Sequence, residues 1–218
     1  MMATTHALAG LALAAALVFI APQFAAVVAV AAIAGGLVPD FDLLASHRRT
    51  LHFPVYYGAF AVPAGLVAAI VPTDLTVGVA VFLGAAGLHS ISDRFGGGLE
   101  PKPWRETSER AVFSHYHGRW LAPRRWIRYD GAPEDLALAV VLAIPALLVF
   151  DGVVQTAVLA MLAVSLGYAI VRKPIVSLGE WLIDRLPASV LSVVPSALLP
   201  IEDESERARD RRKNGDGD

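Results

Sequence analysis

The sequence predicts an all-α, polytopic membrane protein, with about six transmembrane helices in three hairpins and an interfacial helix near the C-terminus. Of its 218 residues, 56% are hydrophobic and only 17% are charged. The mean hydropathy is +0.56, and soluble domains are about a quarter charged. The apolar residues also fall into six stretches, none of which contains Lys or Arg. Lipid is therefore the expected solvent for much of the chain.

Each apolar stretch is long enough to form a helix, although several are shorter than the ~20 residues that cross a bilayer. Short helices of this kind must tilt, thin the bilayer or use flanking residues. Compact breaks rich in Pro, Gly and Asp separate the members of each pair and predict tight hairpin turns. The six stretches are residues 7–21, 24–38, 53–71, 75–91, 136–150 and 153–171.

Pairing these stretches into three hairpins gives a testable topology. Both termini and the segments 39–52, 92–135 and 172–218 then lie on one side of the membrane. All 18 Lys and Arg residues fall on that side, whereas the opposite turns carry only Asp74 and Asp151. Because basic residues favour the cytoplasmic side, we expect six spans in the cell (inner) membrane with both termini in the cytoplasm.

We expect residues 1–200 to form a single integral membrane domain and residues 201–218 to form a disordered charged tail. The segment 174–200 is apolar but contains prolines and charges beside a tryptophan, which is typical of an interfacial amphipathic helix. A seventh span there would place the basic tail outside. A signal peptide at residues 7–21 is disfavoured because no basic residue precedes that stretch.

The candidate chemistry rests on histidine and carboxylate groups, because the chain has no cysteine. All six histidines lie at helix ends or in loops expected on the cytoplasmic side. His89 and Asp93 are four residues apart, so their side chains leave one face of a helix. This spacing suits two ligands of one metal ion and equally suits a hydrogen-bonded His/Asp pair. The six are His6, His47, His52, His89, His115 and His117.

Two acids follow the second apolar stretch. Pro39 disfavours helical backbone before it, so we expect the chain to become extended here and to present Asp40 and Asp42 to one side. Carboxylates at this position are costly beside a bilayer unless water or a cation solvates them. Solvation at a helix end and metal binding are both consistent with the pattern.

The motif HRRTLH places His47 and His52 on either side of Arg48 and Arg49. Imidazoles ligate metals and arginines hold phosphate, although these arginines can also serve only to fix membrane orientation. The three hairpins bring all of these groups to one membrane face. We therefore predict a divalent-metal site, with Zn²⁺ favoured and Mn²⁺ or Fe²⁺ as alternatives, and with enough ligands for two ions. The candidate ligands are His6, Asp40, Asp42, His47, His52, His89 and Asp93.

Four motifs resemble those of the membrane-bound metal-dependent hydrolases of the YdjM type, whose pattern is TH, PDxD, HRGxTHS and HxxxDxxT. The chain has TTH at residues 4–6, PDFD at 39–42, HRRTLHF at 47–53 and HSISDRFG at 89–96. Their order and intervals agree over roughly the first 100 residues. The resemblance implies that the same seven candidate residues bind metal.

The chain departs from this family pattern at four positions. Arg49 replaces a glycine, while Leu51, Phe53 and Gly96 replace residues with hydroxyl groups. Those hydroxyls would support metal ligands by hydrogen bonding, so the departures bear on substrate choice. The family is also distantly similar to the zinc-dependent phospholipase C and P1 nuclease group, which cleaves phosphoesters.

The expected cytoplasmic loop at 92–135 carries eight Lys or Arg residues interleaved with aromatic residues. Basic residues attract anionic lipid headgroups, and Trp and Tyr favour the membrane interface. We therefore expect this loop to lie on the bilayer. Nucleic acid is not an expected partner, because the net charge is −2 and basic excess is the usual mark of such binding. The oligomeric state is left open.

These inferences predict a metal-dependent hydrolase that cleaves a phosphoester, with a lipid-linked substrate as the first candidate. A metal lowers the pKa of bound water toward about 7. Asp40, Asp42 or Asp93 would orient that water, and Arg48 and Arg49 would stabilise developing negative charge. Acid is expected to inactivate, because protonated imidazole cannot bind metal. The alternative is a non-enzymatic membrane scaffold or regulator with a structural His/Asp metal site.

Overall fold

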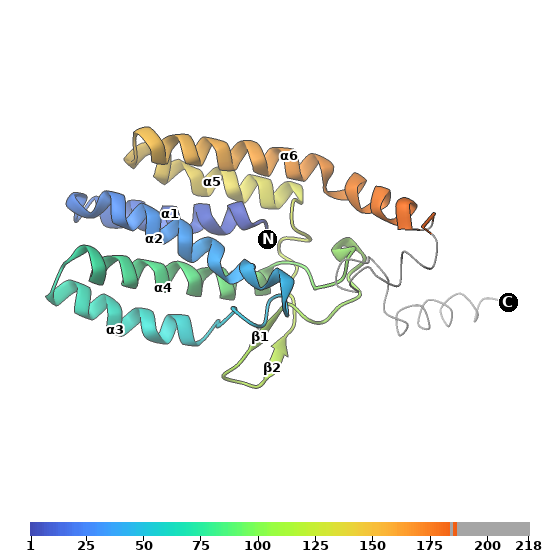
Figure 1. The fold of residues 1–218 in the computed structure, drawn as a ribbon, viewed down its shortest axis with the longest axis horizontal. Coiled ribbons are helices and arrows are strands. Elements are labelled where there is room, and N and C mark those ends of the chain that lie inside the picture. The colour runs from blue at the N-terminus through green and yellow to red at the C-terminus, as the bar shows by residue number, and fades with distance from the viewer. Residues whose placement is uncertain (184, 187–218) are drawn as a thin grey trace.

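The computed structural model describes residues 1–183, 185 and 186, and these residues are mostly helical (Figure 1). The all-α class is confirmed, and each predicted apolar stretch contributes a helix. Short 3-10 turns and one two-stranded hairpin complete the fold. The helices are α1 (Ala3–Val18), α2 (Ala25–Leu37), α3 (Tyr56–Ile70), α4 (Asp74–Ser92), α5 (Pro133–Val149) and α6 (Gly152–Ile183), and the strands are β1 (Val112–Ser114) and β2 (Arg119–Leu121).

Three helical segments are long and apolar enough to cross a membrane, namely Pro22–Leu43, Asp74–Phe95 and Gly152–Ile183. α1 and α3 are apolar but shorter. Large apolar side chains such as Ile70 and Val153 are exposed on the outer helix faces. Extended exposed apolar surface is unusual in water and is what lipid contact requires. The fold therefore indicates a membrane protein with three candidate spans, and the count of six spans stays a prediction.

The helices form three hairpins, α1–α2, α3–α4 and α5–α6, which lie side by side in Figure 1. α1 is central and contacts α2, α4, α5 and α6. At the start of α4, Thr73 Oγ1 accepts a hydrogen bond from Thr76 N at 3.2 Å, and Thr76 Oγ1 accepts one from Thr73 N at 3.0 Å. This reciprocal cap satisfies backbone N–H groups at the helix end.

Small residues allow the central helices to approach closely. The buried core around α1 and α2 is rich in alanine. A Cβ atom added at Gly10 would lie 2.6 Å from the carbonyl oxygen of Ala32, and one added at Gly36 would lie 2.7 Å from the Cα of Ala7. In a membrane, van der Waals contact between small residues is a main source of helix association. The backbone spacing therefore depends on these glycines.

The loop between α4 and α5 is ordered and folds against the helix ends. β1 pairs with β2 in antiparallel register, with Phe113 opposite Trp120. Phe113 N donates to the carbonyl oxygen of Arg48 at 2.9 Å, and Ile127 N donates to that of Phe95 at 3.0 Å. The predicted loop at 92–135 thus packs over the chain segments that carry the candidate metal ligands.

α6 is longer than the sequence predicts. The sixth apolar stretch ends at residue 171, and a separate interfacial helix was expected from residue 174. Instead, one helix runs from Gly152 to Ile183 with Pro174 inside it. Its last part extends beyond the other helices toward the loop region (Figure 1). The rest of the expected interfacial helix and the tail at 201–218 lie outside the described residues.

Gly10→Ala is expected to lower the free energy of unfolding by about 1–3 kcal/mol, because the added methyl group overpacks the α1–α2 contact. Gly65→Ala is the matched control, since nothing lies within 4 Å of a Cβ added there. The control is expected to be neutral or stabilising by up to about 1 kcal/mol. Thermal unfolding in a single detergent measures both variants, and equal midpoints would contradict the close approach.

Candidate metal centre

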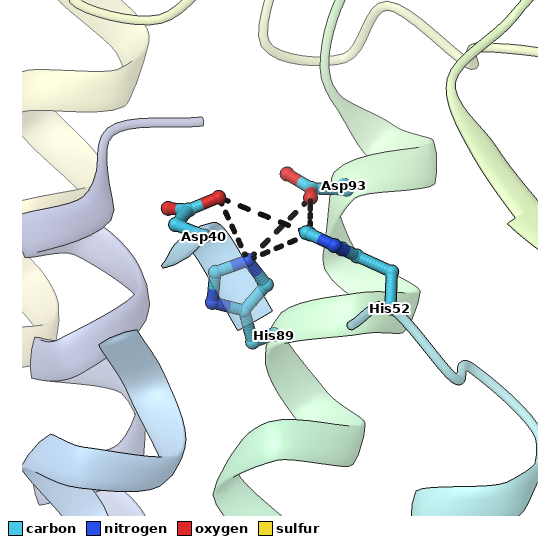
Figure 2. A group of neighbouring side chains, drawn as sticks. All are labelled: Asp40, His52, His89 and Asp93. Carbon is cyan, nitrogen blue, oxygen red and sulfur yellow. Dashed lines mark hydrogen bonds and ion pairs between the residues drawn. The ribbon is translucent and has the colours of Figure 1, made fainter. Parts of the chain in front are cut away.

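Four side chains from separate parts of the chain meet at the loop end of the bundle (Figure 2). Asp40 comes from the 3-10 helix Val38–Leu44, and His52 precedes α3. His89 lies in the last turn of α4, and Asp93 follows that helix directly. One donor atom from each residue lies within 4.8 Å of the others. Three of these side chains are buried, and that of Asp40 is 24% exposed. We refer to them as the four-residue cluster.

Hydrogen bonds on the far side of each ring fix the protonation of the two histidines. His89 Nδ1 lies 2.7 Å from the carbonyl oxygen of Gly36, and His52 Nδ1 lies 3.0 Å from Oδ2 of Asp42. A carbonyl or carboxylate oxygen only accepts, so each Nδ1 carries the proton and donates it. Each Nε2 then presents a lone pair to the cluster, as metal-binding histidines usually do.

The electron-rich atoms of the cluster converge at short distances. The Nε2 atoms of His52 and His89 lie 3.2 Å apart. Asp93 Oδ2 lies 3.1 Å from His52 Nε2, and Asp40 Oδ1 lies 3.4 Å from His89 Nε2. Two positive groups already lie near Asp93, the N-terminal ammonium at 3.5 Å and Arg48 Nε at 3.6 Å. A cation or an added proton between the lone pairs and carboxylates would stabilise the buried cluster further. Two imidazole nitrogens and two carboxylate oxygens are a donor set that fits Zn²⁺.

Asp42 lies behind the cluster and supports His52. Both of its carboxylate oxygens accept hydrogen bonds, and its side chain is fully buried. The contact with His52 Nδ1 fixes that ring, as carboxylates behind metal-binding histidines commonly do. The other donors to Asp42 are the backbone N–H groups of Arg48 (3.2 Å), Arg49 (3.2 Å) and Leu51 (3.1 Å) and the ring Nδ1 of His47 (3.1 Å).

The expectation of extended backbone after Pro39 was wrong, because Val38–Leu44 is a 3-10 helix. Proline is tolerated in the first turn of a helix, where its missing N–H is not needed. At three residues per turn, positions two apart point about a third of a turn away from one another. The Asp40 side chain therefore points toward the other three cluster residues, whereas that of Asp42 points toward the backbone of the following loop.

His6 contacts the cluster from α1. Its Nε2 lies 3.1 Å from Asp93 Oδ1, and its Nδ1 lies 3.1 Å from Ser92 Oγ. The His6 ring also stacks on that of His89, with centroids 3.8 Å apart. Asp93 contacts His52 through its other oxygen. The Asp93 carboxylate therefore links His6 of α1 to His52 of the cluster.

The first three residues of the HRRTLH motif lie in two environments. His47 and Arg48 line a cavity beside the cluster, and the pKa of His47 is lowered by burial and by the nearby Arg48 charge. Arg48 Nε lies 3.6 Å from Asp93 Oδ2, while its Nη1 donates to the carbonyl oxygen of Gly97 at 2.9 Å. The guanidinium of Arg49 lies over the Phe113 ring, 4.6 Å from its centroid.

A cavity of about 900 Å³ adjoins the cluster, and Asp40 is the cluster residue that lines it. Charged and polar groups around Asp40 form one part of its wall. α6 supplies another part, in which apolar side chains recur at helical spacing. These apolar residues are Val164, Ile175, Val176, Leu182 and Ile183. The cavity is therefore amphipathic, with the cluster on its polar side.

Two acids that the sequence analysis did not single out anchor this region, the partly buried Asp130 and the fully buried Asp135. Asp130 pairs with Arg172 at 2.8 Å and accepts a hydrogen bond from Tyr168. Burial raises the pKa of Asp130, but the Arg172 charge outweighs this effect and the net pKa is lowered. Asp135 accepts from Met2 N and Thr5 Oγ1, both at 2.8 Å. The Asp135 contacts join residues 130 and 133 positions apart, and the Asp130 contacts join residues 38 and 42 positions apart, so no local spacing could indicate them.

Comparisons of the chain with family models, with curated proteins and with solved structures gave no match. The chemistry of the site therefore rests on its own geometry.

Zn²⁺ is expected to raise the thermal unfolding midpoint of the full chain, because a ligand that binds only the folded protein stabilises it, by about 2.7 kcal/mol at 100 times Kd. His89→Ala is expected to abolish this shift. His117→Ala is the matched control, since the His117 ring contacts Ser114 at the end of β1, and it should respond like the wild type. A wild-type midpoint that does not respond to Zn²⁺, Mn²⁺ or Fe²⁺ would contradict the site.

Asp42→Asn tests the supporting role of Asp42. The amide has the same shape but only one acceptor oxygen, so its NH₂ group must face N–H donors that both oxygens of Asp42 now satisfy, and the negative charge behind His52 is lost. Zinc affinity is expected to fall about 10–100-fold while the helical content is kept. Isothermal titration measures the affinity, and circular dichroism checks the fold. Wild-type affinity in this variant would show that Asp42 does not position the ligand.

Proposed function

We propose that the chain is a membrane-bound metal-dependent hydrolase of the YdjM type, which cleaves a phosphoester with metal-activated water. The observation that carries this proposal is the convergence of two buried imidazole lone pairs and two carboxylates beside an amphipathic cavity. The cluster reaches that cavity only through Asp40 among its four members. A site closed on all sides would favour a structural metal, whereas access from a cavity favours catalysis.

The cluster would hold one divalent cation, with Zn²⁺ the best match to its donors. Such a cation lowers the pKa of a bound water and polarises a phosphoryl oxygen. Asp40 is the cluster carboxylate that faces the cavity, and it is placed to accept a proton from water there. Asp93 is held by His6 and Arg48 on either side, which suits a fixed ligand rather than a proton carrier.

Arg48 is the residue placed to bind a phosphate group. Its side chain lines the cavity, and its buried Nε atom lies 3.6 Å from Asp93 Oδ2, too far for a hydrogen bond, with no hydrogen-bond partner among the described residues. A buried N–H without a hydrogen bond is costly, and a phosphate oxygen would supply one. Arg49 lies over Phe113 instead, so the proposal assigns no catalytic role to Arg49.

The membrane arrangement belongs to the same proposal. We place all six helices in the cell membrane with both termini in the cytoplasm, so that the cluster lies at the inner lipid boundary. The ordered loop at 92–135 would contact anionic headgroups through its basic and aromatic side chains. A substrate linked to lipid could then reach the cavity from the inner leaflet, with its apolar part against α6 and its phosphate at Arg48.

The test compares wild type with His89→Ala and Asp40→Ala, purified as full-length proteins in detergent. Metal content by elemental analysis is measured beside hydrolysis of a chromogenic phosphodiester and of phospholipid in mixed micelles. We expect about one metal per chain and turnover in the wild type, and the loss of both in His89→Ala. In Asp40→Ala, turnover should fall by at least about 10–100-fold, which is the usual effect of removing a residue that supports a metal ligand.

His117→Ala is the matched control in this assay and is expected to keep both metal and turnover. Stoichiometric metal without turnover of either substrate would reject hydrolysis and favour the structural site of a membrane scaffold or regulator. Metal and turnover that are both unchanged in His89→Ala would reject the cluster itself.

A further inference from the structure

Glu100 is a buried acid on the cavity wall, outside the four-residue cluster. It lies in the loop after α4 and is 7% exposed. One carboxylate oxygen, Oε1, accepts a hydrogen bond from Thr107 N at 3.1 Å. The other, Oε2, is buried with no hydrogen-bond partner among the described residues. A buried carboxylate oxygen without a donor is costly, so this position calls for a donor from a ligand.

The other cations that line this cavity or lie next to Glu100 in the chain have partners of their own, and the N-terminal ammonium of Met1, for example, lies 3.5 Å from Asp93 Oδ1. Asp130 is paired with Arg172. Lys102, beside Glu100 in the chain, forms an ion pair with Glu180 of α6. Arg172 and Lys102 therefore pair with acids other than Glu100. A positively charged hydrogen-bond donor is the group that best satisfies an unpaired buried carboxylate.

Arg48 is a cation that lines the same cavity as Glu100. Its Nη1 donates to the carbonyl oxygen of Gly97, and the Glu100 carboxylate folds back over Gly98, where a Cβ atom would overlap Oε2. Thus Arg48 contacts the segment 97–100 and Glu100 belongs to it, and each has one buried polar atom without a hydrogen bond among the described residues, beside one cavity. Together these groups match a ligand that carries a phosphate and an N–H donor.

We infer that Glu100 is a specificity-determining residue that binds the primary ammonium group of a phosphoester headgroup while Arg48 binds its phosphate. This inference rests on the proposed function, because it names the substrate class of the same cavity. The preferred ligand is a lipid with an aminoalkyl phosphate headgroup. Its acyl part lies along the apolar residues that α6 contributes to the cavity. A quaternary ammonium lacks the N–H donor, and a glycerol headgroup lacks the charge, so both bind less well.

The experiment measures lipid binding rather than hydrolysis, using full-length protein in detergent treated with EDTA. Native mass spectrometry gives the affinities for phosphatidylethanolamine, phosphatidylcholine and phosphatidylglycerol with identical acyl chains. In the wild type we expect phosphatidylethanolamine to bind about tenfold more tightly than the other two, as one charge-assisted hydrogen bond allows. Glu100→Gln should lose this preference, and Glu100→Asp should keep part of it.

Glu106→Gln is the matched control, because Glu106 is an exposed acid in the same loop, and it should bind all three lipids like the wild type. Glu100→Gln keeps the oxygen that accepts from Thr107 N, so its melting temperature should stay near that of the control. Equal affinities for the three lipids in the wild type, or an unchanged preference in folded Glu100→Gln, would overturn the inference. Selective binding without phosphoester turnover would reject the proposed hydrolysis and leave the Glu100 site standing.

Discussion

The repulsion between the electron-rich atoms of His52, His89, Asp40 and Asp93 is the constraint on which the loop end of this fold depends. The Nε2 atoms of His52 and His89 lie 3.2 Å apart. They cannot both present lone pairs beside carboxylates unless a positive charge lies between them. The surrounding structure holds this arrangement in place. Gly36 fixes one ring, Asp42 fixes the other, and each does so from outside the cluster. The chain thus positions donors that a divalent cation would stabilise.

Helix packing and cluster geometry are linked through Gly36. Its missing side chain lets α1 approach α2, since a Cβ there would lie 2.8 Å from the carbonyl oxygen of His6. Its own carbonyl oxygen accepts the Nδ1 proton of His89 from α4. His6 in turn stacks on His89 and contacts Asp93. The three helices therefore set the ligand positions directly, and small shifts between them would change the distances within the cluster.

Sequence patterns predicted the helices and the end of the bundle where the polar groups gather, because apolar stretches and short turns are local properties. All four cluster residues belong to the seven predicted candidates. The patterns could not separate Asp40 from Asp42, since that choice depends on a 3-10 turn and on N–H groups in the loop at 48–51. Nor could they indicate Glu100, whose burial depends on how a loop rich in glycine folds against Thr107.

The length of α6 explains why apolar side chains line the same cavity as the polar groups. Residues 175, 176, 179, 182 and 183 all line the cavity, and this spacing is one face of a helix. Had the helix ended at residue 171, the cavity would keep Val164 but lose the other apolar side chains that α6 contributes to it, namely Ile175, Val176, Leu182 and Ile183. Lys102 and Glu180 tie this part of α6 to the loop, while Arg172 and Asp130 tie the preceding turn. Two ion pairs thus keep an apolar wall close to the cluster. A ligand with a polar part and an apolar part can therefore contact the polar side of the cavity and α6 at the same time.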